Sequence, residues 1–413
     1  MVTETLKIAP SVYWVGVNDT VTRLFEGLWD VSEGVSYNSY LVVGSKNIAL
    51  IDSVGSRFEE EHLAKIEQVI DPAEIEYLIL NHMEQDHTEA VPKLLQKAPK
   101  AKVVLTPMAF SMLKAFYHLE PQTLIVRGDS TQIDLGGKSL RFVPTPFLHW
   151  PETMSTYLAE EKILFSCDLF GSFKRLPEKA ILDADIQDVE RYIQEASREY
   201  FAGVISRYRE YVLKAVEKFK ALGLEFEVLA PSHGPVYTAH REEVISLWSS
   251  WSRPDYARKV VIAVGSMYGT TFKLVEALVE GVEEAGGEAV VCNLVEDAPA
   301  KTLGALLDAP ALIVGTPTYE HGLFPPVAHF LRLLESKKLT GRVAGAFGSF
   351  GWSRGGVKKL VERLNALGFR LVGNPLEVRG SPLSEDLEKA RVMGRRVADI
   401  AFYEGGKHGF PKV

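Results

Sequence analysis

The chain has 413 residues, 46% of them hydrophobic and 24% charged, and its 46 Lys and Arg are outnumbered by 54 Asp and Glu. This length suits two domains of about 150 to 250 residues each, and this composition is typical of a globular protein without disordered tracts. A net charge of -8 with no basic stripe argues against a nucleic-acid partner.

Neither the N-terminal segment nor the cysteine content indicates secretion. The segment MVTETLKIAPSVYW has no basic part followed by an apolar part, and no run of about 18 apolar residues occurs. We therefore expect a cytoplasmic protein that does not bind membranes. Only Cys167 and Cys292 are present, far apart in the sequence, which excludes a disulfide framework and a thiolate metal site. Any metal must be held by His and carboxylates.

The first part of the chain predicts a layered α/β/β/α unit that ends near Trp251. Its segment 81–90, NHMEQDHTEA, comes between a strand and a helix, so we expect a loop at the carboxyl end of that strand. Expected strands are 11–17, 36–43, 47–52, 76–80, 102–106, 123–128, 140–145, 153–160, 162–168 and 225–231. Expected helical segments are 59–70, 91–98 and long stretches from about 187 to 222.

The segment 251–259 has the Pro and the charged residues of a linker, and the order of the expected strands and helices changes after it. We therefore place the domains at 1–253 and 254–413. Strands and helices now alternate, which predicts a five-stranded parallel doubly wound sheet with ligands at the carboxyl ends of its strands. Expected strands are 259–265, 288–294, 311–316, 343–349 and 369–373. Expected helices are 272–286, 302–307, 329–337, 357–368 and 383–404.

Candidate metal ligands are concentrated in the loop at 81–90. It holds His82, Glu84, Asp86 and His87. The same residue types return after three later apolar runs, as His149, Asp168 and His233. One polar turn, or one histidine after a strand, is more often structural, but the recurrence at four places favours a metal site.

The loop resembles that of the metallo-β-lactamase superfamily, which usually reads His-x-His-x-Asp-His, with Glu84 in place of the second histidine. An oxygen donor at this position, in a set without thiolates, favours iron over zinc. The pattern His-x-Glu-x-Asp-His, with the later His, Asp and His, is similar to that of the flavodiiron proteins, also called A-type flavoproteins. The resemblance implies an N-terminal metallo-β-lactamase-like αβ/βα sandwich.

The resemblance also implies a ligand set for two iron ions. His82, Glu84 and His149 would bind one iron, and Asp86, His87 and His233 the other, with Asp168 as the bridge. His87 is the ligand most open to replacement by solvent. We expect no catalytic residue beyond these ligands, and we expect Trp150, Pro151 and Glu152 to surround them.

Three loops of the second part form a candidate flavin site. The first follows a strand and opens a helix, which suits a phosphate bound by backbone N–H groups. Helices are often capped by such residues, so the loop alone is weak support. The candidate residues are Ser266, Met267, Tyr268, Gly269, Thr270 and Thr271, then Pro317, Thr318, Tyr319 and Gly322, then Ser349, Phe350, Gly351, Trp352 and Gly355.

This second part resembles flavodoxin over about 257 to 404, and its loops match the phosphate loop and the two flavin loops in order. FMN is therefore the expected cofactor, and the lack of a G-x-G-x-x-G fingerprint argues against FAD or NAD. A flavodoxin-like domain that binds no flavin is the alternative. One departure is Glu320-His321, which stands where the family commonly shows Asn-rich sequence.

Together the resemblances imply an oxidoreductase that reduces dioxygen to water, nitric oxide to nitrous oxide, or both, with FMN resupplying the irons. No cysteine follows Cys292, so we expect electrons from a separate donor such as rubredoxin. The expected assembly is a head-to-tail homodimer, or a dimer of such dimers, in which each FMN faces the diiron site of the partner. Two alternatives stay open: a zinc-dependent hydrolase with an appended flavodoxin domain, and an electron-transfer module whose first domain serves only for docking.

Overall fold

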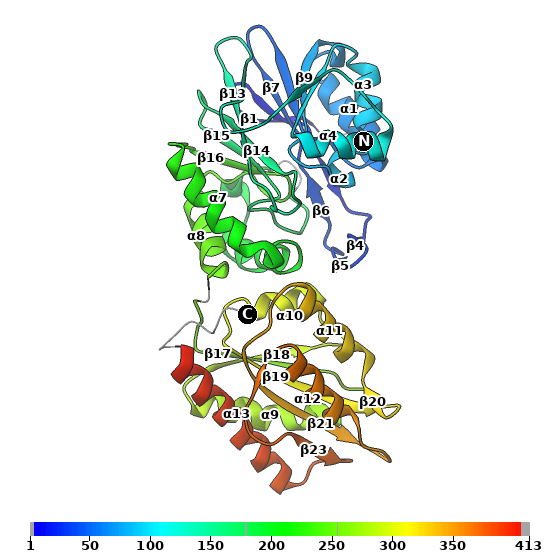
Figure 1. Cartoon of the computed structure of the whole chain (residues 1–413), viewed down its shortest axis with the longest axis vertical. Coiled ribbons are helices and arrows are strands. Elements are labelled where there is room, and N and C mark those ends of the chain that lie inside the picture. The colour runs from blue at the N-terminus through cyan, green and yellow to red at the C-terminus, as the bar shows by residue number, and fades with distance from the viewer. Residues whose placement is uncertain (1–3, 178–179, 254, 406–413) are drawn as a thin grey trace. The chain divides into compact units, whose positions relative to one another are not determined.

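The computed structural model describes residues 4–177, 180–253 and 255–405 (Figure 1). The chain divides into two compact units, Met1–Ser252 and Arg253–Val413. Pro254, in the predicted linker, lies outside the described residues. Among the described residues, no helix combines the length and the apolar character that a membrane crossing requires.

The N-terminal unit contains two packed sheets. The first has the order β1 (Leu6–Ala9), β2 (Val12–Trp14), β7 (Tyr40–Val43), β8 (Ile48–Ile51), β9 (Ile75–Ile79), β10 (Lys102–Leu105) and β11 (Thr123–Ile125). The second has the order β12 (Gln132–Asp134), β13 (Ser139–Pro144), β14 (Met154–Leu158), β15 (Ile163–Cys167) and β16 (Val228–Pro231). One core joins them, because Tyr40 and Ile79 of the first sheet share a buried cluster with Phe142 and Phe165 of the second.

Two small antiparallel pairs complete the strands of this unit. They are β3 (Val17–Asp19) with β6 (Val35–Tyr37), and β4 (Leu24–Phe25) with β5 (Trp29–Asp30). The predicted strand 36–43 is therefore two strands, β6 and β7, which belong to different sheets. The chain changes sheet at Asn38 and Ser39, whose side chains bond to other segments.

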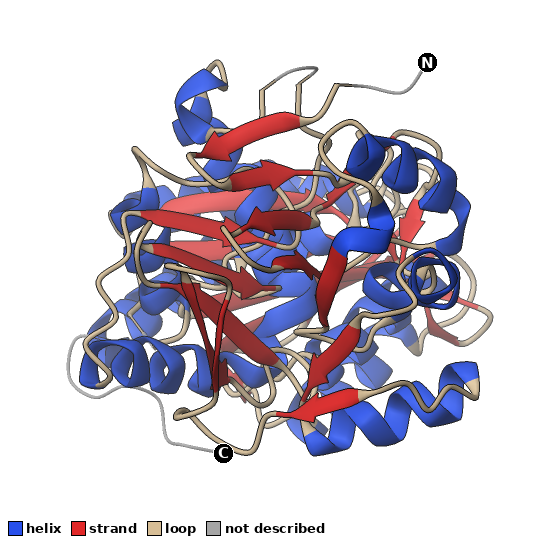
Figure 2. Cartoon of the chain, turned by 90° about the horizontal axis from the view of Figure 1, so that it is seen from above, coloured by secondary structure: helices blue, strands red, loops and turns tan. Residues whose placement is uncertain are grey.

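Helices cover both sheets, as the predicted α/β/β/α layering requires (Figure 1). The outer face of the first sheet carries α1 (Glu59–Glu67), α3 (Val91–Lys97) and α4 (Pro107–Tyr117), whose Leu63, Leu94 and Leu113 share a buried cluster with the strands. The second sheet is flanked by α7 (Arg209–Ala221) and α8 (Arg241–Trp251). Figure 2 shows the strands in red and the helices that cover them in blue.

The helical stretches predicted from about 187 to 222 form a series of short helical segments that ends in α7. This series consists of α5 (Val189–Tyr192), a π-helical turn Ile193–Ser197, α6 (Arg198–Tyr200), a second π-helical turn Phe201–Ile205, a 3-10 turn Ser206–Tyr208 and α7. A π turn holds an extra residue, which periodicity at 3.6 residues does not reveal. Ala196, Tyr200 and Phe201 are all fully buried in this region.

The C-terminal unit has the predicted parallel, doubly wound sheet. The order is β18 (Glu288–Asn293), β17 (Lys259–Val264), β19 (Ala311–Tyr319), β21 (Val343–Phe350) and β22 (Arg370–Leu371), with β23 (Leu376–Arg379) also parallel to β21. The short β20 (Gly322–Leu323) pairs antiparallel with the end of β19. The helices are α9 (Val275–Glu284), α10 (Pro299–Ala305), α11 (Pro325–Ser336), α12 (Gly356–Ala366) and α13 (Ser384–Gly405).

Helices α9 and α13 pack on the same side of this sheet and share its main core. Their contact requires glycine on both helices. A Cβ at Gly281 of α9 would lie 2.0 Å from the carbonyl oxygen of Arg391, and a Cβ at Gly394 of α13 would lie 2.2 Å from that of Leu278. Since real Cβ atoms do not approach backbone so closely, the two helices can pack at this distance only where both residues lack a side chain.

Candidate metal centre and flavin loops

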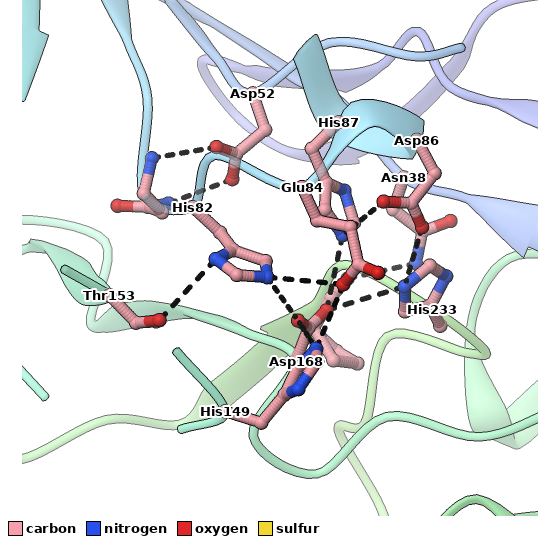
Figure 3. A network of polar contacts seen from close by, with 12 residues as sticks. Asn38, Asp52, His82, Glu84, Asp86, His87, His149, Thr153, Asp168 and His233 are labelled. Carbon is pink, nitrogen blue, oxygen red and sulfur yellow. Dashed lines mark hydrogen bonds and ion pairs between the residues drawn. The ribbon is translucent and has the colours of Figure 1, made fainter. Parts of the chain in front are cut away.

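The structure brings together all seven predicted metal ligands (Figure 3). They form two groups, in each of which the potential ligand atoms lie within 4.8 Å of one another. The groups are His82, Glu84, His149 and Asp168, and then Asp86, His87 and His233. Such convergence of imidazoles and carboxylates is the arrangement that a two-metal site needs.

The ligands come from four connections at the edge of the two sheets. The segment after β9 supplies the first four, and Asp86 and His87 lie on a one-turn helix, α2 (Gln85–Thr88), rather than in a plain loop. The turn forms because the carbonyl oxygen of Glu84 accepts hydrogen bonds from the His87 backbone N–H and the Thr88 hydroxyl. His149 lies between β13 and β14, Asp168 directly after β15, and His233 after β16.

Asp168 lies between the two groups. Its Oδ2 is 3.4 Å from Nε2 of His82, and its Oδ1 is 3.2 Å from Nε2 of His87 and 3.3 Å from Nε2 of His233. Glu84 belongs to the first group, since its Oε2 lies 2.8 Å from Nε2 of His149. One carboxylate therefore faces both groups with one oxygen each.

Three of the four imidazoles differ in how their second nitrogen is held. Nδ1 of His82 lies 2.7 Å from Oε1 of Glu152, which is buried, and Nδ1 of His233 lies 2.8 Å from the carbonyl oxygen of Ser36. Each contact leaves Nε2 turned toward the cluster. Neither ring nitrogen of His87 has a hydrogen-bond partner among the described residues, although this side chain is fully buried.

Hydrogen bonds from distant segments hold the ligand loops in place. The amide of Asn38 donates to the carbonyl oxygens of Pro231 and Gly234, on both sides of His233. The carboxylate of Asp52 accepts from the backbone and side-chain amides of Asn81, next to His82. No local pattern in the sequence signals these supports, because each joins residues that are far apart along the chain.

The charges of the cluster favour bound cations. Burial alone would lower the pKa of His82, but the hydrogen bond to Glu152 and other contacts outweigh it and raise this pKa well above its ordinary value. Burial also opposes the charge of His87, yet Asp86 and Asp168 raise its pKa to about 9. Burial would raise the pKa of Asp168, but the surrounding imidazoles hold it well below its usual range. The cluster therefore attracts positive charge strongly.

Aromatic side chains surround His233. The ring centroids of Phe25, Tyr37 and Tyr200 lie 5.4, 5.6 and 5.5 Å from that of His233. The hydroxyl of Tyr200 is buried and has no hydrogen-bond partner within the described part of the chain. Burial, followed by the charges of Asp168 and Asp86, raises its pKa well above the ordinary value, so the phenol stays protonated. Sequence reasoning did not single out these residues.

Whether metal ions fit this cluster can be judged from the buried polar atoms that make no hydrogen bond. Both carboxylate oxygens of Asp86 and Asp168, both ring nitrogens of His87 and Nε2 of His233 accept or donate no hydrogen bond among the described residues. These carboxylate oxygens and the Nε2 atoms face one another only as ion pairs at 3.2–3.5 Å. Because a buried polar group without a hydrogen bond costs about 1–3 kcal/mol, this concentration of such atoms favours an additional partner. The donor set of nitrogen and hard oxygen atoms fits two divalent or trivalent cations.

The three predicted flavin loops lie together at the carboxyl ends of neighbouring strands. Residues 266–271 follow β17, residues 317–322 span the end of β19 and β20, and residues 349–355 follow from the end of β21 to the start of α12. Oγ1 of Thr271 lies 2.9 Å from Oγ of Ser349, and Oγ1 of Thr318 accepts from the backbone N–H of Gly356. These bonds link the first loop to the third, and the second to the third.

The first of these loops has the features of a phosphate site. The backbone N–H groups of residues 266–270 find no hydrogen-bond acceptor within the described residues, and they precede the 3-10 turn Thr271–Leu274 and α9. Gly269 has a φ of +82°, and a Cβ there would meet nothing within 4 Å. Tyr319 and Trp352, in the second and third loops, are 39% and 78% exposed, so their rings are open to a ligand. The loops therefore fit a flavin phosphate and ring.

Comparison with known proteins agrees with this pairing of a metallo-β-lactamase-like unit and a flavodoxin-like unit. The family described as "ODP family beta lactamase" matches residues 35–234, and the flavodoxin family matches residues 262–394. The nitric oxide reductase of Moorella thermoacetica is 33% identical over 398 residues, which cover 96% of this chain and 98% of that protein. The rubredoxin-oxygen oxidoreductase of Megalodesulfovibrio gigas is 30% identical over 397 residues, with coverage of 96% and 98%.

Solved structures show the same relationship over the full length. The flavodiiron protein from Giardia intestinalis superposes with a TM-score of 0.91 at 31% identity, covering 98% of each chain. The rubredoxin oxygen:oxidoreductase from Desulfovibrio gigas gives a TM-score of 0.90 at 29% identity, covering 98% of this chain and 100% of that chain. This chain belongs to the flavodiiron protein family, and it is an oxidoreductase.

Proposed function

We propose that this protein reduces dioxygen to water, nitric oxide to nitrous oxide, or both, at two iron ions held by the seven-residue cluster. The observation that carries the proposal is the convergence of seven histidine and carboxylate side chains in two groups around Asp168. The names of the relatives from Moorella thermoacetica and Megalodesulfovibrio gigas support both gases as candidates. When bound, the metal pair would supply electrons to a small ligand, and FMN would resupply them.

The residues of the chain have separable roles in this proposal. His82, Glu84 and His149 would hold one iron, and Asp86, His87 and His233 the other, with Asp168 between them. The buried rings around His233 would keep water from this side of the site. Glu84, an oxygen donor, favours iron over zinc and therefore argues against a zinc hydrolase.

FMN would bind on the three loops of the flavodoxin-like unit. Its phosphate would accept hydrogen bonds from the free backbone N–H groups of residues 266–270, which include that of Gly269. Residues of the other two loops, including Tyr319 and Trp352, would flank the flavin ring. Electrons would come from a separate protein donor such as rubredoxin, as the name of the relative from Megalodesulfovibrio gigas suggests.

We further propose that the working form is a head-to-tail homodimer, or a dimer of such dimers, in which the FMN of one chain serves the irons of the other. A closed two-fold arrangement would give each iron site one flavin. A cytoplasmic location remains our expectation from the sequence.

Metal and flavin analysis followed by rapid mixing tests the proposed function. Protein from iron-replete cells should hold about two irons and one FMN per chain. Each of the two ligand groups would bind one iron, and the three loops would bind one flavin. The reduced protein should then be mixed anaerobically with dioxygen or with nitric oxide in a stopped-flow instrument, and flavin reoxidation followed. Zinc in both positions, with no gas reduction after reconstitution with iron, would contradict the proposal.

A further inference from the structure

The two groups of candidate ligands are not supported equally. Behind the first group, Nδ1–H of His82 donates to Oε1 of Glu152 over 2.7 Å, and both side chains are fully buried. Behind the second group, Nδ1–H of His233 donates to the backbone carbonyl oxygen of Ser36. An anion thus supports one group, and a neutral acceptor supports the other.

Glu152 is itself fixed in place. Its Oε1 also accepts from the backbone N–H of Met83, 3.0 Å away, and its carbonyl oxygen accepts from the hydroxyl of Thr106. The first bond ties Glu152 to the residue directly after His82. The carboxylate therefore holds both the ring of His82 and the backbone beside it.

The second group has no comparable support. His87 has no hydrogen-bond partner on either ring nitrogen among the described residues, and both oxygens of Asp86 are likewise without one. Each group has one carboxylate of its own, Glu84 in the first and Asp86 in the second, so Glu152 is the negative charge that the first group has in addition. Asp168 faces both groups and does not distinguish them.

We propose that Glu152 is a positioning residue for His82, and that it makes the position of His82, Glu84 and His149 the tighter of the two metal positions. A carboxylate that accepts the second N–H of an imidazole fixes the orientation of the ring and raises its strength as a ligand. Removal of such a partner typically weakens metal binding about 10- to 100-fold. This inference rests on the proposed function, because it assumes that the cluster binds two metal ions.

The test is a titration of the metal-free full-length protein with Co²⁺ alone, under anaerobic conditions, followed by visible absorption and by calorimetry. The parent protein should bind two Co²⁺ in two steps. Glu152→Gln keeps an acceptor for His82 but removes the charge, and Glu152→Ala removes both. The tighter step should weaken about 10-fold or more in these variants, and more in Ala than in Gln. The weaker step should stay within about twofold of the parent.

Thr153→Val is the matched control, because Oγ1 of Thr153 lies 3.4 Å from the same Nδ1 of His82 but carries no charge. It should bind both ions as the parent does. Thermal unfolding of each metal-free variant shows whether the fold is intact, and Glu152→Gln carries the test if Glu152→Ala does not fold.

The outcomes separate the two hypotheses. If the parent binds two Co²⁺ and both affinities are unchanged in Glu152→Gln and in every other folded Glu152 variant, Glu152 is not a positioning residue. The proposed function is not affected by that result. Equal weakening of both steps would also overturn the role of Glu152, since it would show a general structural role. A parent that binds fewer than two Co²⁺ would overturn the proposed function and this inference with it.

Discussion

Oδ1 of Asp168 lies 3.2 Å from Nε2 of His87, although Asp168 follows strand β15 of the second sheet and His87 follows strand β9 of the first. The other oxygen of Asp168 faces His82 of the first ligand group. A single carboxylate thus joins the two groups, and no other described side chain contacts ligand histidines of both groups through an ion pair in this way. This position makes Asp168 the most direct test of the metal centre.

Asp168→Ala should abolish gas reduction and lower the iron content, because it removes the oxygens that face both groups. The flavin should still bind and be reduced, since the three loops lie in the other compact unit. Iron analysis, steady-state gas consumption and photoreduction of the flavin measure these effects. Cys167→Ser, a change to the buried neighbour, should keep most of the iron. Near-normal iron and turnover in Asp168→Ala would show that Asp168 is only structural.

Gly269→Asp should expel FMN, because an acidic side chain would enter the open space beside the free N–H groups of the first loop. We expect the affinity for FMN to fall at least about 100-fold, the size of an unfavourable change near 3 kcal/mol. Fluorescence titration of the flavin-free protein measures this affinity, and metal analysis should show the iron unchanged.

Gly368→Asp is the control for backbone strain. Gly368 also has a positive φ, +75°, and open space at its Cβ, but it follows α12 at the opposite end of the strands. The strain of a side chain at positive φ is therefore similar in both variants. FMN bound equally well by Gly269→Asp and Gly368→Asp would show that the phosphate loop has been misplaced.

Acid should destabilise the N-terminal unit through His62. Burial, with the charge of Lys65, lowers the pKa of His62 to about 3 from the ordinary 6.5. Between pH 6.5 and pH 3 the His62 side chain binds a proton in the unfolded chain but not in the folded chain. The contribution of His62 to the free energy of unfolding is therefore complete above pH 6.5 and is lost as the pH falls below it. Between pH 7 and pH 4.5 the free energy of unfolding should lose about 2–3 kcal/mol from this group.

His62→Gln should remove that part of the pH dependence, which denaturant unfolding at several pH values measures. His118→Gln, at an exposed position of the same unit, is the matched control for the exchange of a histidine for a glutamine. The same slope in His62→Gln and the parent between pH 7 and pH 4.5 would show that His62 is already neutral in the unfolded chain or protonated in the folded one.

A mixed dimer tests the proposed transfer of electrons between chains. Asp168→Ala chains and Gly269→Asp chains should each be inactive alone, since one lacks a working metal centre and the other lacks FMN. Mixed dimers isolated through two different tags should regain activity at one site, because the flavin of the first chain can serve the irons of the second. A mixed dimer that is correctly loaded with both cofactors and still inactive would rule out transfer between chains.

Local pattern was enough to select the candidate ligand residues and the candidate flavin loops. The carboxyl ends of parallel strands meet at one edge of a sheet, so polar residues after successive apolar runs must come together there. This reason groups Gly269 and Trp352 in the C-terminal unit. His82 and Asp168 follow strands of different sheets, and the recurrence of their residue types and the family resemblance grouped them with His233. The sequence pattern did not predict the π turns between 193 and 205, because an inserted residue changes the helical period locally.

Only the tertiary structure decided how each ligand is held. Ser36 and His233 are 197 residues apart, and Glu152 and His82 are 70 apart, yet each pair shares one hydrogen bond. The sequence predicts that Glu152 lies near the ligands, but it does not indicate which histidine Glu152 contacts, and it gives no sign of the role of Ser36, because a backbone carbonyl is present at every position. The sequence determined which side chains could bind metal, and the packing of the two sheets decided which imidazole has an anion behind it.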